Sequence, residues 1–438
     1  MGDARRAALT ALERCRRGGA WSDAVLSSVL TGEGLDTRDR GLAVALCYGV
    51  MQNRTYLDWR IAAVSSLPLR KIEPKVLDVL RVSAYQLIFM DRIPASAAVN
   101  EGVKLTRAMG FARAAGFVNA VLRRLASAQE PPFPADAAER LSIQYSHPRP
   151  LVDALLRRLG EAETEALLRC DNAPAPAALQ VNTLRTDCRS LRARLAAEGL
   201  ETEEHPFLPD CLMADTVGDL AELPAFREGL FYVQDAAARL AVIAAEPQRG
   251  QKILDACAAP GGKSFAAAVA AGEADITACD LHENKLKRIR ESAARLGVDN
   301  MIQTLACDAR ENRPDWNGAF DLVIADVPCS GLGVIRKKPD IRWKDPADFA
   351  ALPEIQAAIL KNTARYVRVG GTLLYSTCTV RQEENEDTVR AFLAETPDYT
   401  AEPFSLPGGL TAPEGLLQLW PQRHGTDGFF MAKLRRMA

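Results

Sequence analysis

The chain has few histidines and lacks several patterns that would assign it to a common class. Its four histidines are dispersed and none of its ten cysteines forms a C-x-x-C pair, which argues against a metal site, a zinc ribbon and a disulfide framework. It contains no run of about 18 apolar residues, and residues 1–6 lack the apolar core of a signal peptide. We therefore expect no membrane span and no metal, and a reducing, cytoplasmic environment.

The composition that remains is typical of a globular protein. Of 438 residues, 48% are apolar and 25% are charged, and the length suits two or three domains. The net charge of −2 conceals an asymmetry, because residues 1–126 carry 19 Lys and Arg against 11 Asp and Glu. A basic N-terminal module suggests a polyanionic partner such as nucleic acid, although a solvated helical surface has the same charge.

Residues 1–126 show helical spacing of apolar residues, most clearly over 43–50, 76–87 and 97–109. The phrases that stand out are RDRGLA, LCYGV, LRVSAYQL and GFVNAVLRR. Together they resemble the NusB-like RNA-binding domain. This resemblance implies that basic residues near the start contact RNA phosphates: Arg5, Arg6, Arg14, Arg16 and Arg17. Each of them is equally well explained as a surface arginine.

Two regions separate this module from the C-terminal part. Residues 127–140 are polar and rich in Pro and Ala, which predicts a linker. Residues 141–235 predict a small α+β domain, with helices over 151–159, 162–170 and 191–197 and strands over 177–182, 211–213 and 230–233. The phrase LQVNT (179–183) resembles the linker domain that precedes the catalytic domain of RNA 5-methylcytosine methyltransferases.

Residues 236–438 predict an α/β domain with a doubly wound sheet, because strand and helix patterns alternate from residue 251 onward. Strands are expected over 252–257, 275–280, 302–306, 320–326 and 372–377, and helices over 264–271, 283–296, 353–367 and 382–394. Further strands at 416–419 and 428–434 would form an antiparallel edge. Such an edge fits a seven-stranded methyltransferase sheet better than an all-parallel one.

The first strand leads into a glycine turn and a helix in QKILDACAAPGGKS, residues 251–264. Cys257 stands where a P-loop has its first glycine, and the dinucleotide fingerprint G-x-G-x-x-G is absent. The third candidate ligand is S-adenosylmethionine, which has no phosphates and whose cationic end suits Asp255. The alternative is a tight turn that binds no ligand. The predicted cofactor contacts in this turn are Cys257, Ala258, Ala259, Pro260, Gly261, Gly262 and Lys263.

Aspartates end four of the predicted strands: Asp255, Asp280, Asp308 and Asp326. The ligand of an open α/β sheet lies beyond the carboxyl ends of its strands. We therefore expect Asp280 to accept hydrogen bonds from both ribose hydroxyls, with a helix N-cap as the alternative. Asp308 would lie beside the adenine, or would simply end its strand in a turn.

Cys329 and Cys378 follow the fourth and fifth predicted strands, which are neighbours in the expected sheet. Both thiols should then open into one pocket. A buried cysteine is usually an inert small apolar residue. Two cysteines at neighbouring strand ends, each flanked by Ser or Thr and beside a cofactor turn, are a candidate reactive pair.

The phrases CAAPGGK, DVPCSG and YSTC resemble the motifs of the Sun/Fmu (RsmB-type) family of RNA (cytosine-5)-methyltransferases. With the NusB-like region, the resemblance is to members that act on bacterial 16S ribosomal RNA. It implies a class I S-adenosylmethionine-dependent methyltransferase fold, S-adenosylmethionine as cofactor, Cys378 as nucleophile and Cys329 as the residue that releases the product. One departure is Val327, where the family usually has alanine.

Carbon 5 of cytosine needs help to attack a methyl group, and a thiolate adding to carbon 6 supplies it by making the ring an enamine. This chemistry alone does not assign the two roles, since DNA cytosine methyltransferases use a Pro-Cys cysteine in the position of Cys329. Asp326 would hydrogen-bond nitrogen 3 and the amino group of the base, besides lying near the cofactor. Lys263 would polarise groups in the same pocket, or is a surface lysine.

A basic segment, RKKPDIRW (336–343), follows the Cys329 motif. It suits a loop that grips a single-stranded target whose base must leave its stack, or it is only an exposed loop. Two other functions stay open: the same chemistry on transfer RNA or another RNA, and a non-catalytic RNA-binding assembly factor.

Overall fold

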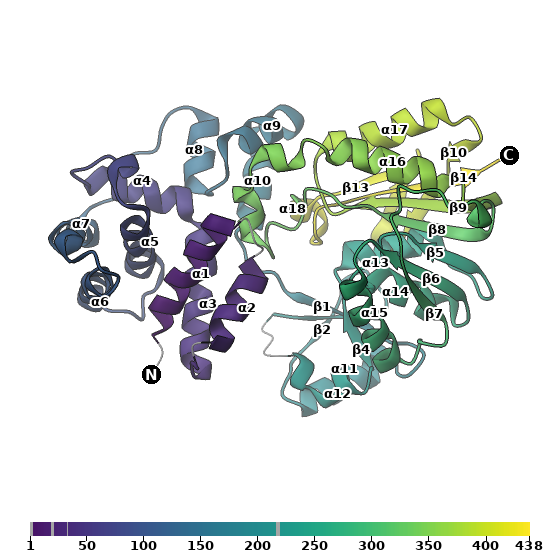
Figure 1. Ribbon diagram of the computed structural model, residues 1–438, viewed down its shortest axis with the longest axis horizontal. Helices are drawn as coiled ribbons and strands as arrows, with labels where there is room; N and C mark the ends of the chain where they lie inside the picture. Colours follow the sequence, from purple (N-terminus) through teal and green to yellow (C-terminus); the bar gives the residue numbers. More distant parts are fainter. Residues whose placement is uncertain (1–2, 19–21, 33, 216–219) are drawn as a thin grey trace. The chain divides into compact units, whose positions relative to one another are not determined.

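The computed structural model describes residues 3–18, 22–32, 34–215 and 220–438, and the chain divides into two compact units (Figure 1). Unit 1 comprises residues 1–173 and 337–344, and unit 2 comprises residues 174–336 and 345–438. Each unit has its own apolar core.

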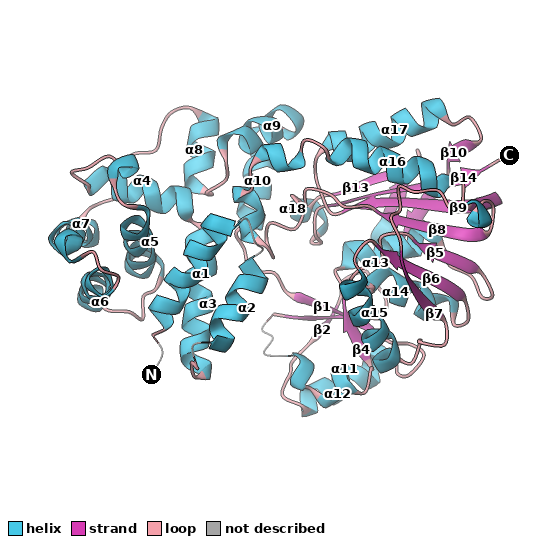
Figure 2. Ribbon diagram, viewed as in Figure 1, coloured by secondary structure: helices cyan, strands magenta, loops and turns pink. Residues whose placement is uncertain are grey.

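Unit 1 is helical over its described residues (Figure 2). The helices with predicted apolar faces are confirmed as α3, α5 and α6. Asp36 caps α3 by accepting a hydrogen bond from the Asp39 amide at 2.7 Å, and Pro74 begins α5. The helices are α1 (Ala4–Gly18), α2 (Ser22–Gly32), α3 (Thr37–Gln52), α4 (Arg54–Val64), α5 (Pro74–Phe89), α6 (Ala95–Ala108), α7 (Ala115–Ser127), α8 (Ala137–Gln144), α9 (Arg149–Leu159) and α10 (Glu161–Asp171).

Helices α8 to α10 belong to unit 1, although the sequence groups residues 141–173 with the α+β segment that follows. Helix α8 begins at Ala137, inside the predicted linker. Earlier in that linker, the ring of Phe133 stacks on Trp59 with centroids 4.7 Å apart. The linker is thus partly helical and packed, and the domain boundaries at 126, 140 and 235 stay predictions.

Unit 2 begins with a small antiparallel sheet of order β2-β3-β1-β4. Its strands are β1 (Ala177–Val181), β2 (Glu203–Glu204), β3 (Cys211–Ala214) and β4 (Phe231–Val233), and its helices are α11 (Cys188–Ala197) and α12 (Pro224–Arg227). The three predicted strands and the predicted helix are therefore confirmed. Asp187 caps α11 by accepting from the Ser190 amide at 2.8 Å.

The main sheet of unit 2 has the strand order β10-β14-β9-β8-β5-β6-β7, with β13 also paired to β14. Strands β5 to β9 are parallel, and β14 runs antiparallel to β9, which confirms the doubly wound α/β methyltransferase fold and its antiparallel edge. The strands are β5 (Lys252–Asp255), β6 (Asp275–Asp280), β7 (Ile302–Ala306), β8 (Phe320–Asp326), β9 (Val367–Thr377), β10 (Tyr399–Ala401), β13 (Leu416–Leu419) and β14 (Phe429–Arg436).

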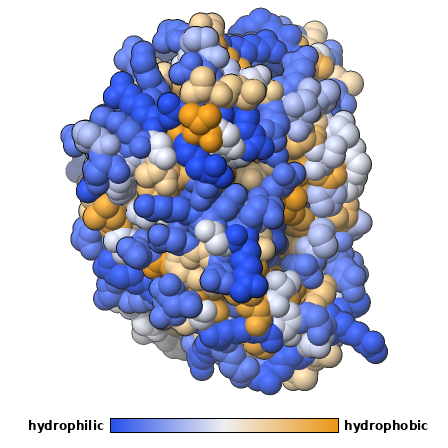
Figure 3. All heavy atoms as spheres, turned by 90° about the vertical axis from the view of Figure 1, so that its right-hand side faces the viewer, coloured by the Kyte–Doolittle hydropathy of each residue, from blue (hydrophilic) through white to orange (hydrophobic). Residues whose placement is uncertain are grey.

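Alternate residues of these strands enter two apolar layers, because side chains in a strand point to opposite faces. Ile253 and Ile324 pack with α13 (Ala236–Ala245), α14 (Gly262–Ala271) and α15 (Glu283–Leu296), whereas Leu254 and Val323 pack with α16 (Leu352–Ala364) and α17 (Glu386–Glu395) (Figure 1). The remaining elements are β11 (Phe404–Leu406), β12 (Leu410–Ala412) and α18 (Pro421–His424). On the face drawn in Figure 3, hydrophilic residues predominate and apolar ones form small groups.

Candidate active site

The glycine turn lies between β5 and α14, as predicted. Gly261 has φ of +106°, and a Cβ atom there would lie 2.4 Å from Cζ of Phe265. Its amide donates to the Ala258 carbonyl at 2.6 Å, and the Ala258 amide donates to the Cys279 carbonyl of β6 at 2.6 Å. Only glycine fits this position, so the turn exposes main chain rather than side chains at the start of α14.

Asp255, at the end of β5, is fully buried beneath this turn. Its Oδ2 accepts a hydrogen bond from Ser264 Oγ at 2.7 Å, while Oδ1 has no hydrogen-bond partner. Burial raises the pKa of Asp255 to about 7. Burial, followed by the negative charges of Asp255, Asp326 and Asp280, also raises the pKa of Cys257 well above its ordinary value. Carboxylates from three strand ends therefore surround the turn.

Asp280 and Asp308 end β6 and follow β7, at the same edge of the sheet. Asp280 is 8% exposed; its Oδ1 accepts from the His282 amide at 3.0 Å and lies 3.5 Å from Lys285 Nζ. Asp308 accepts hydrogen bonds from the amide and the guanidinium of Arg310, both at 2.9 Å, which lowers its pKa. A carboxylate suits ribose hydroxyls, and the contacts of Asp280 are made through Oδ1, whereas both oxygens of Asp308 accept from the Arg310 guanidinium.

Asp326 and Lys263 form the polar centre of the site. Lys263 Nζ lies 2.6 Å from Asp326 Oδ2, and Ser376 Oγ of β9 donates to Oδ1 at 2.8 Å. Lys263 is 8% exposed and its ammonium lies 5.1 Å from the centre of the Phe429 ring. The reading of Lys263 as a surface lysine is therefore wrong.

Cys329 and Cys378 lie close together after the ends of β8 and β9. Cys329 follows β8 and Cys378 follows β9, and their Sγ atoms are 3.3 Å apart. Both residues are partly exposed. The hydrogen bond to Cys378, burial, and the negative charges of Cys378 and Glu384 raise the pKa of Cys329 well above its ordinary value. Either sulfur can donate in this bond.

Only part of the basic segment after Cys329 is exposed as predicted. Arg342 is 2% exposed in unit 1, where its guanidinium donates to Asn172 Oδ1 at 2.9 Å and to the Gln52 carbonyl at 3.2 Å. The indole of Trp343 donates to the Met51 carbonyl at 2.7 Å. The prediction that Arg342 grips RNA is wrong, because its guanidinium is buried and donates hydrogen bonds to acceptors within unit 1. Lys337 and Lys338 are exposed.

The proposed phosphate contacts on α1 differ from one another. Arg5 Nε donates to Gln86 Oε1 at 2.8 Å, and Arg16 Nε lies 3.4 Å from Asp78. Arg6, Arg14 and Arg16 are exposed, and the side chain of Arg17 lies outside the described residues. Arg6, Arg14 and Arg16 therefore stay candidates on the ground of exposure.

Sequence reasoning missed Ser376, which orients Asp326, although it lies inside the quoted YSTC phrase. It also missed Gly333, whose amide donates to the Cys378 carbonyl at 3.0 Å. A Cβ atom at Gly333 would lie 1.8 Å from the Gly428 carbonyl oxygen. In the described part of the chain, no His, Cys, Asp and Glu side chains gather in a group able to hold a metal ion, and no helix is both long and apolar enough to cross a membrane.

Comparison with known proteins gives three family matches. Residues 242–435 match the model of 16S rRNA methyltransferase RsmB/F, residues 2–127 that of the NusB family, and residues 147–220 that of the RsmF/B-like, ferredoxin-like domain. The chain is 37% identical to "Probable ribosomal RNA small subunit methyltransferase B" of Bacillus subtilis over 98% of both chains. It is 37% identical to "Ribosomal RNA small subunit methyltransferase B" of Vibrio cholerae over 91% of this chain and 90% of that one.

Among solved structures, the crystal structure of PH0851 superposes with a TM-score of 0.82 at 26% identity. The superposition covers 99% of this chain and 98% of that chain. The similarity therefore extends over both units and is not confined to the methyltransferase sheet.

Proposed function

This chain belongs to the 16S rRNA methyltransferase RsmB/F family and is an S-adenosylmethionine-dependent RNA methyltransferase, and we propose that it methylates carbon 5 of a cytosine in 16S ribosomal RNA through a covalent cysteine–cytosine adduct. The observation that carries this proposal is the 3.3 Å separation of the Cys329 and Cys378 sulfurs at the ends of adjacent strands. A methyltransferase that acts on a nucleophilic nitrogen or oxygen needs no such pair.

The donor set at the strand ends fits S-adenosylmethionine, which when bound supplies an electrophilic methyl group on a positive sulfonium. Asp280 would hold the ribose, the main chain of residues 257–262 would approach the methionine end, and Asp308 would lie near the adenine. The carboxylates around the turn suit a cation and would repel a phosphate, which supports this cofactor over a nucleotide. Asp255, buried and without a partner on Oδ1, lies beneath the same turn.

We assign the nucleophile to Cys378 because its YSTC phrase resembles the family motif, since the contact between the two sulfurs does not distinguish them. A hydrogen bond donated by Cys329 would stabilise a thiolate on Cys378. Attack forms the bond between Cys378 Sγ and carbon 6, and carbon 5 then takes up the methyl group. Addition of the thiolate places negative charge on nitrogen 3, which takes up a proton from solvent. Asp326, held by Lys263 and Ser376, would then accept hydrogen bonds from this protonated nitrogen and from the amino group of the base.

Release requires a base that removes the hydrogen from carbon 5, so that the bond between Cys378 Sγ and carbon 6 breaks. We assign this role to Cys329, because its Sγ lies 3.3 Å from Cys378 Sγ and is therefore close to the adduct. Both thiols must be reduced for this chemistry, which supports a cytoplasmic location.

Bisulfite mapping of RNA from cells with and without the gene tests the proposal. We expect one or a few cytosines of 16S ribosomal RNA to lose protection from bisulfite when the gene is deleted, and to regain it on complementation. If only cytosines of transfer RNA lose protection from bisulfite, the substrate is transfer RNA and the proposed chemistry still holds. Unchanged protection in all RNA would contradict methylation of carbon 5.

A further inference from the structure

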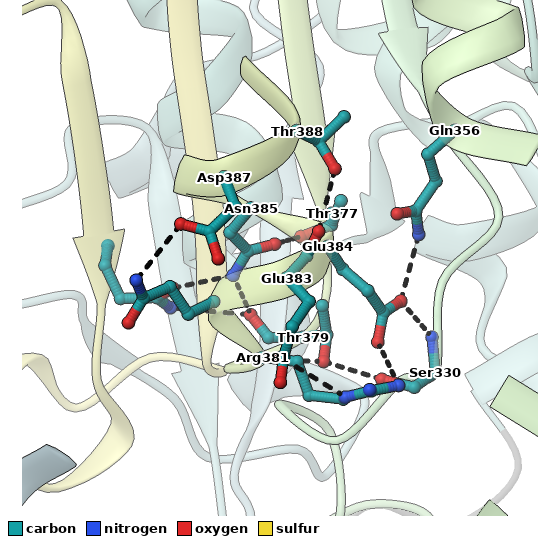
Figure 4. Close-up of polar contacts among 12 residues, drawn as sticks. Ser330, Gln356, Thr377, Thr379, Arg381, Glu383, Glu384, Asn385, Asp387 and Thr388 are labelled. Carbon is teal, nitrogen blue, oxygen red and sulfur yellow. Dashed lines mark hydrogen bonds and ion pairs between the residues drawn. The ribbon is translucent and has the colours of Figure 1, made fainter. Parts of the chain in front are cut away.

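Glu384 holds the chain on both sides of Cys329. It precedes α17, and its carboxylate is fully buried. Its Oε2 accepts hydrogen bonds from the Ser330 amide at 2.8 Å and from Gln356 Nε2 at 2.9 Å (Figure 4). The same Gln356 nitrogen donates to the Pro328 carbonyl at 3.0 Å. The residues before and after Cys329 are therefore tied to one carboxylate.

Asn385, the next residue, holds the chain on both sides of Cys378. It too is fully buried. Its Oδ1 accepts from Thr377 Oγ1 at 2.5 Å, and its Nδ2 donates to the Thr379 carbonyl at 3.0 Å. A further bond from Nδ2 to Gln418 Oε1, 2.8 Å long, fixes the orientation of the amide.

The two sets of contacts are joined to each other. Ser330 Oγ and Thr379 Oγ1, each one residue after a cysteine, are 2.7 Å apart. Tyr375 Oη of β9 donates to the Glu384 carbonyl at 2.6 Å. The charge of the buried carboxylate is balanced by Arg381, whose Nη1 lies 3.2 Å from Oε1.

We propose that Glu384 and Asn385 are positioning residues that set the separation of the two reactive sulfurs, Glu384 through the backbone around Cys329 and Asn385 through the Thr377 side chain and the Thr379 carbonyl on either side of Cys378. This inference rests on the proposed function, in which Cys378 attacks the base and Cys329 releases the product. Neither side chain needs to touch the RNA or the cofactor. Their burial within unit 2 and their bonds to the flanking residues define the role.

Substitutions of these two adjacent residues should then differ in whether the covalent adduct accumulates. In Glu384→Ala, Cys329 is misplaced while Cys378 still attacks, so we expect turnover to fall on the order of 100-fold and the covalent protein–RNA adduct to accumulate. In Asn385→Ala, Cys378 is misplaced, so turnover falls similarly but no adduct accumulates. A residue that only stabilised the fold would lower adduct and turnover together, so adduct accumulation separates the two roles for Glu384, whereas for Asn385→Ala an unchanged thermal transition and the thiol-bridging measurement below separate them. The matched controls are Glu383→Ala and Asp387→Ala, which alter exposed neighbours on the same segment (Figure 4).

A second measurement tests the geometry without any RNA. Phenylarsine oxide bridges two thiols that lie close together: arsenic bonds to both sulfurs, and the two thiol protons leave with its oxygen as water. Peptide mass mapping of the full-length protein should show Cys329 and Cys378 bridged in the wild type and in both controls. We expect the bridging rate at this pair to fall at least ten-fold in Glu384→Ala and Asn385→Ala. Wild-type rates in both variants would overturn the inference.

If Glu384→Ala does not fold, as judged by its thermal transition, Glu384→Gln keeps the shape and an acceptor oxygen. Because Oε2 accepts from the Ser330 amide and from Gln356 while Oε1 faces Arg381, an amide NH2 at either place opposes a donor, so adduct accumulation and slower bridging should also appear in Glu384→Gln. Wild-type turnover and bridging in Glu384→Gln would count against the inference. Absence of adduct in Cys329→Ala would instead contradict the proposed function, and the bridging result would still decide the positioning role.

Discussion

Lys263 Nζ lies 2.6 Å from Asp326 Oδ2, and this ion pair joins the first turn of α14 to the carboxyl end of β8. The other carboxylate oxygen is held by Ser376, so the orientation of Asp326 is fixed from two sides. The helix that follows the glycine turn is thus tied directly to the residue expected to bind the target base.

Replacing Lys263 by methionine keeps most of its volume and removes its charge. We expect kcat at saturating cofactor to fall on the order of 100-fold, because Asp326 loses the partner that orients it. Single-turnover methyl transfer measures this effect. Lys287→Met, on the exposed face of α15, is the control and should match the wild type. Equal rates in all three proteins would remove Lys263 from the site.

Gly261→Ala tests whether the glycine turn binds the cofactor. The new Cβ would lie 2.4 Å from the Phe265 ring, so the start of α14 must shift, and we expect calorimetry to show at least ten-fold weaker binding of S-adenosylmethionine. The control is Gly272→Ala. Gly272 follows the last residue of the same helix with a φ of +71°, and a Cβ atom placed there would have no atom within 4 Å. It shares the backbone strain, about 1–3 kcal/mol, and should keep normal affinity. Equal affinity in the two variants would contradict the assignment of the turn.

Asp255 predicts a specific pH dependence of stability. Its pKa is about 7 in the folded chain and about 4 in the unfolded chain, so the unfolded state releases this proton first as pH rises. The contribution of Asp255 to the free energy of unfolding is therefore complete below about pH 4. It declines toward pH 7, by at most about 1.4 kcal/mol per pH unit.

Asp255→Asn should lose this decline, which urea unfolding at a series of pH values would detect. Asp275→Asn, at the exposed start of β6, is the control and should retain the wild-type slope. The same slope in Asp255→Asn and the wild type would show that the pKa of Asp255 is the same in the folded and the unfolded protein.

The exposed arginines of α1 predict how RNA binding depends on salt. In the double variant Arg6→Gln with Arg14→Gln, the slope of log K against log salt should become shallower by about 0.7–0.9 for each RNA phosphate that an arginine no longer neutralises. Filter binding over a range of salt concentrations measures it, with the exposed Arg249→Gln of unit 2 as control. These substitutions are preferable to deleting residues 1–126, because α8 to α10 belong to the same unit. An unchanged slope would show that Arg6 and Arg14 do not bind RNA phosphates.

The elements closest to the site were predictable because each has a local signal. The runs that became β6, β7 and β8 are bounded by turn residues, and the meeting of Cys329 with Cys378 follows from two strand ends being neighbours in a doubly wound sheet. The start of β9 at Val367 was missed by five residues, because residues 368–370 are exposed and carry no apolar pattern. Strand β10, three residues long, gives too short a pattern to detect.

Burial of charged side chains could not be predicted, because it depends on partners distant in the chain. Glu384 lies in the run RQEENED, which is typical of an exposed helix start, yet its partners Ser330 and Gln356 are 54 and 28 residues away. Arg342 lies in a basic run and is buried by acceptors from the first 172 residues. Neither run contains a local signal that marks the buried member.

The most direct test is to map the covalent bond. Incubated with S-adenosylmethionine and substrate RNA, the Cys329→Ala variant should accumulate a protein–RNA adduct on denaturing gels, and peptide mass mapping should place the nucleotide on Cys378. Cys378→Ala and the double variant should form no adduct and no product while binding the cofactor normally. An adduct on another cysteine, or undiminished turnover in Cys378→Ala, would contradict the account.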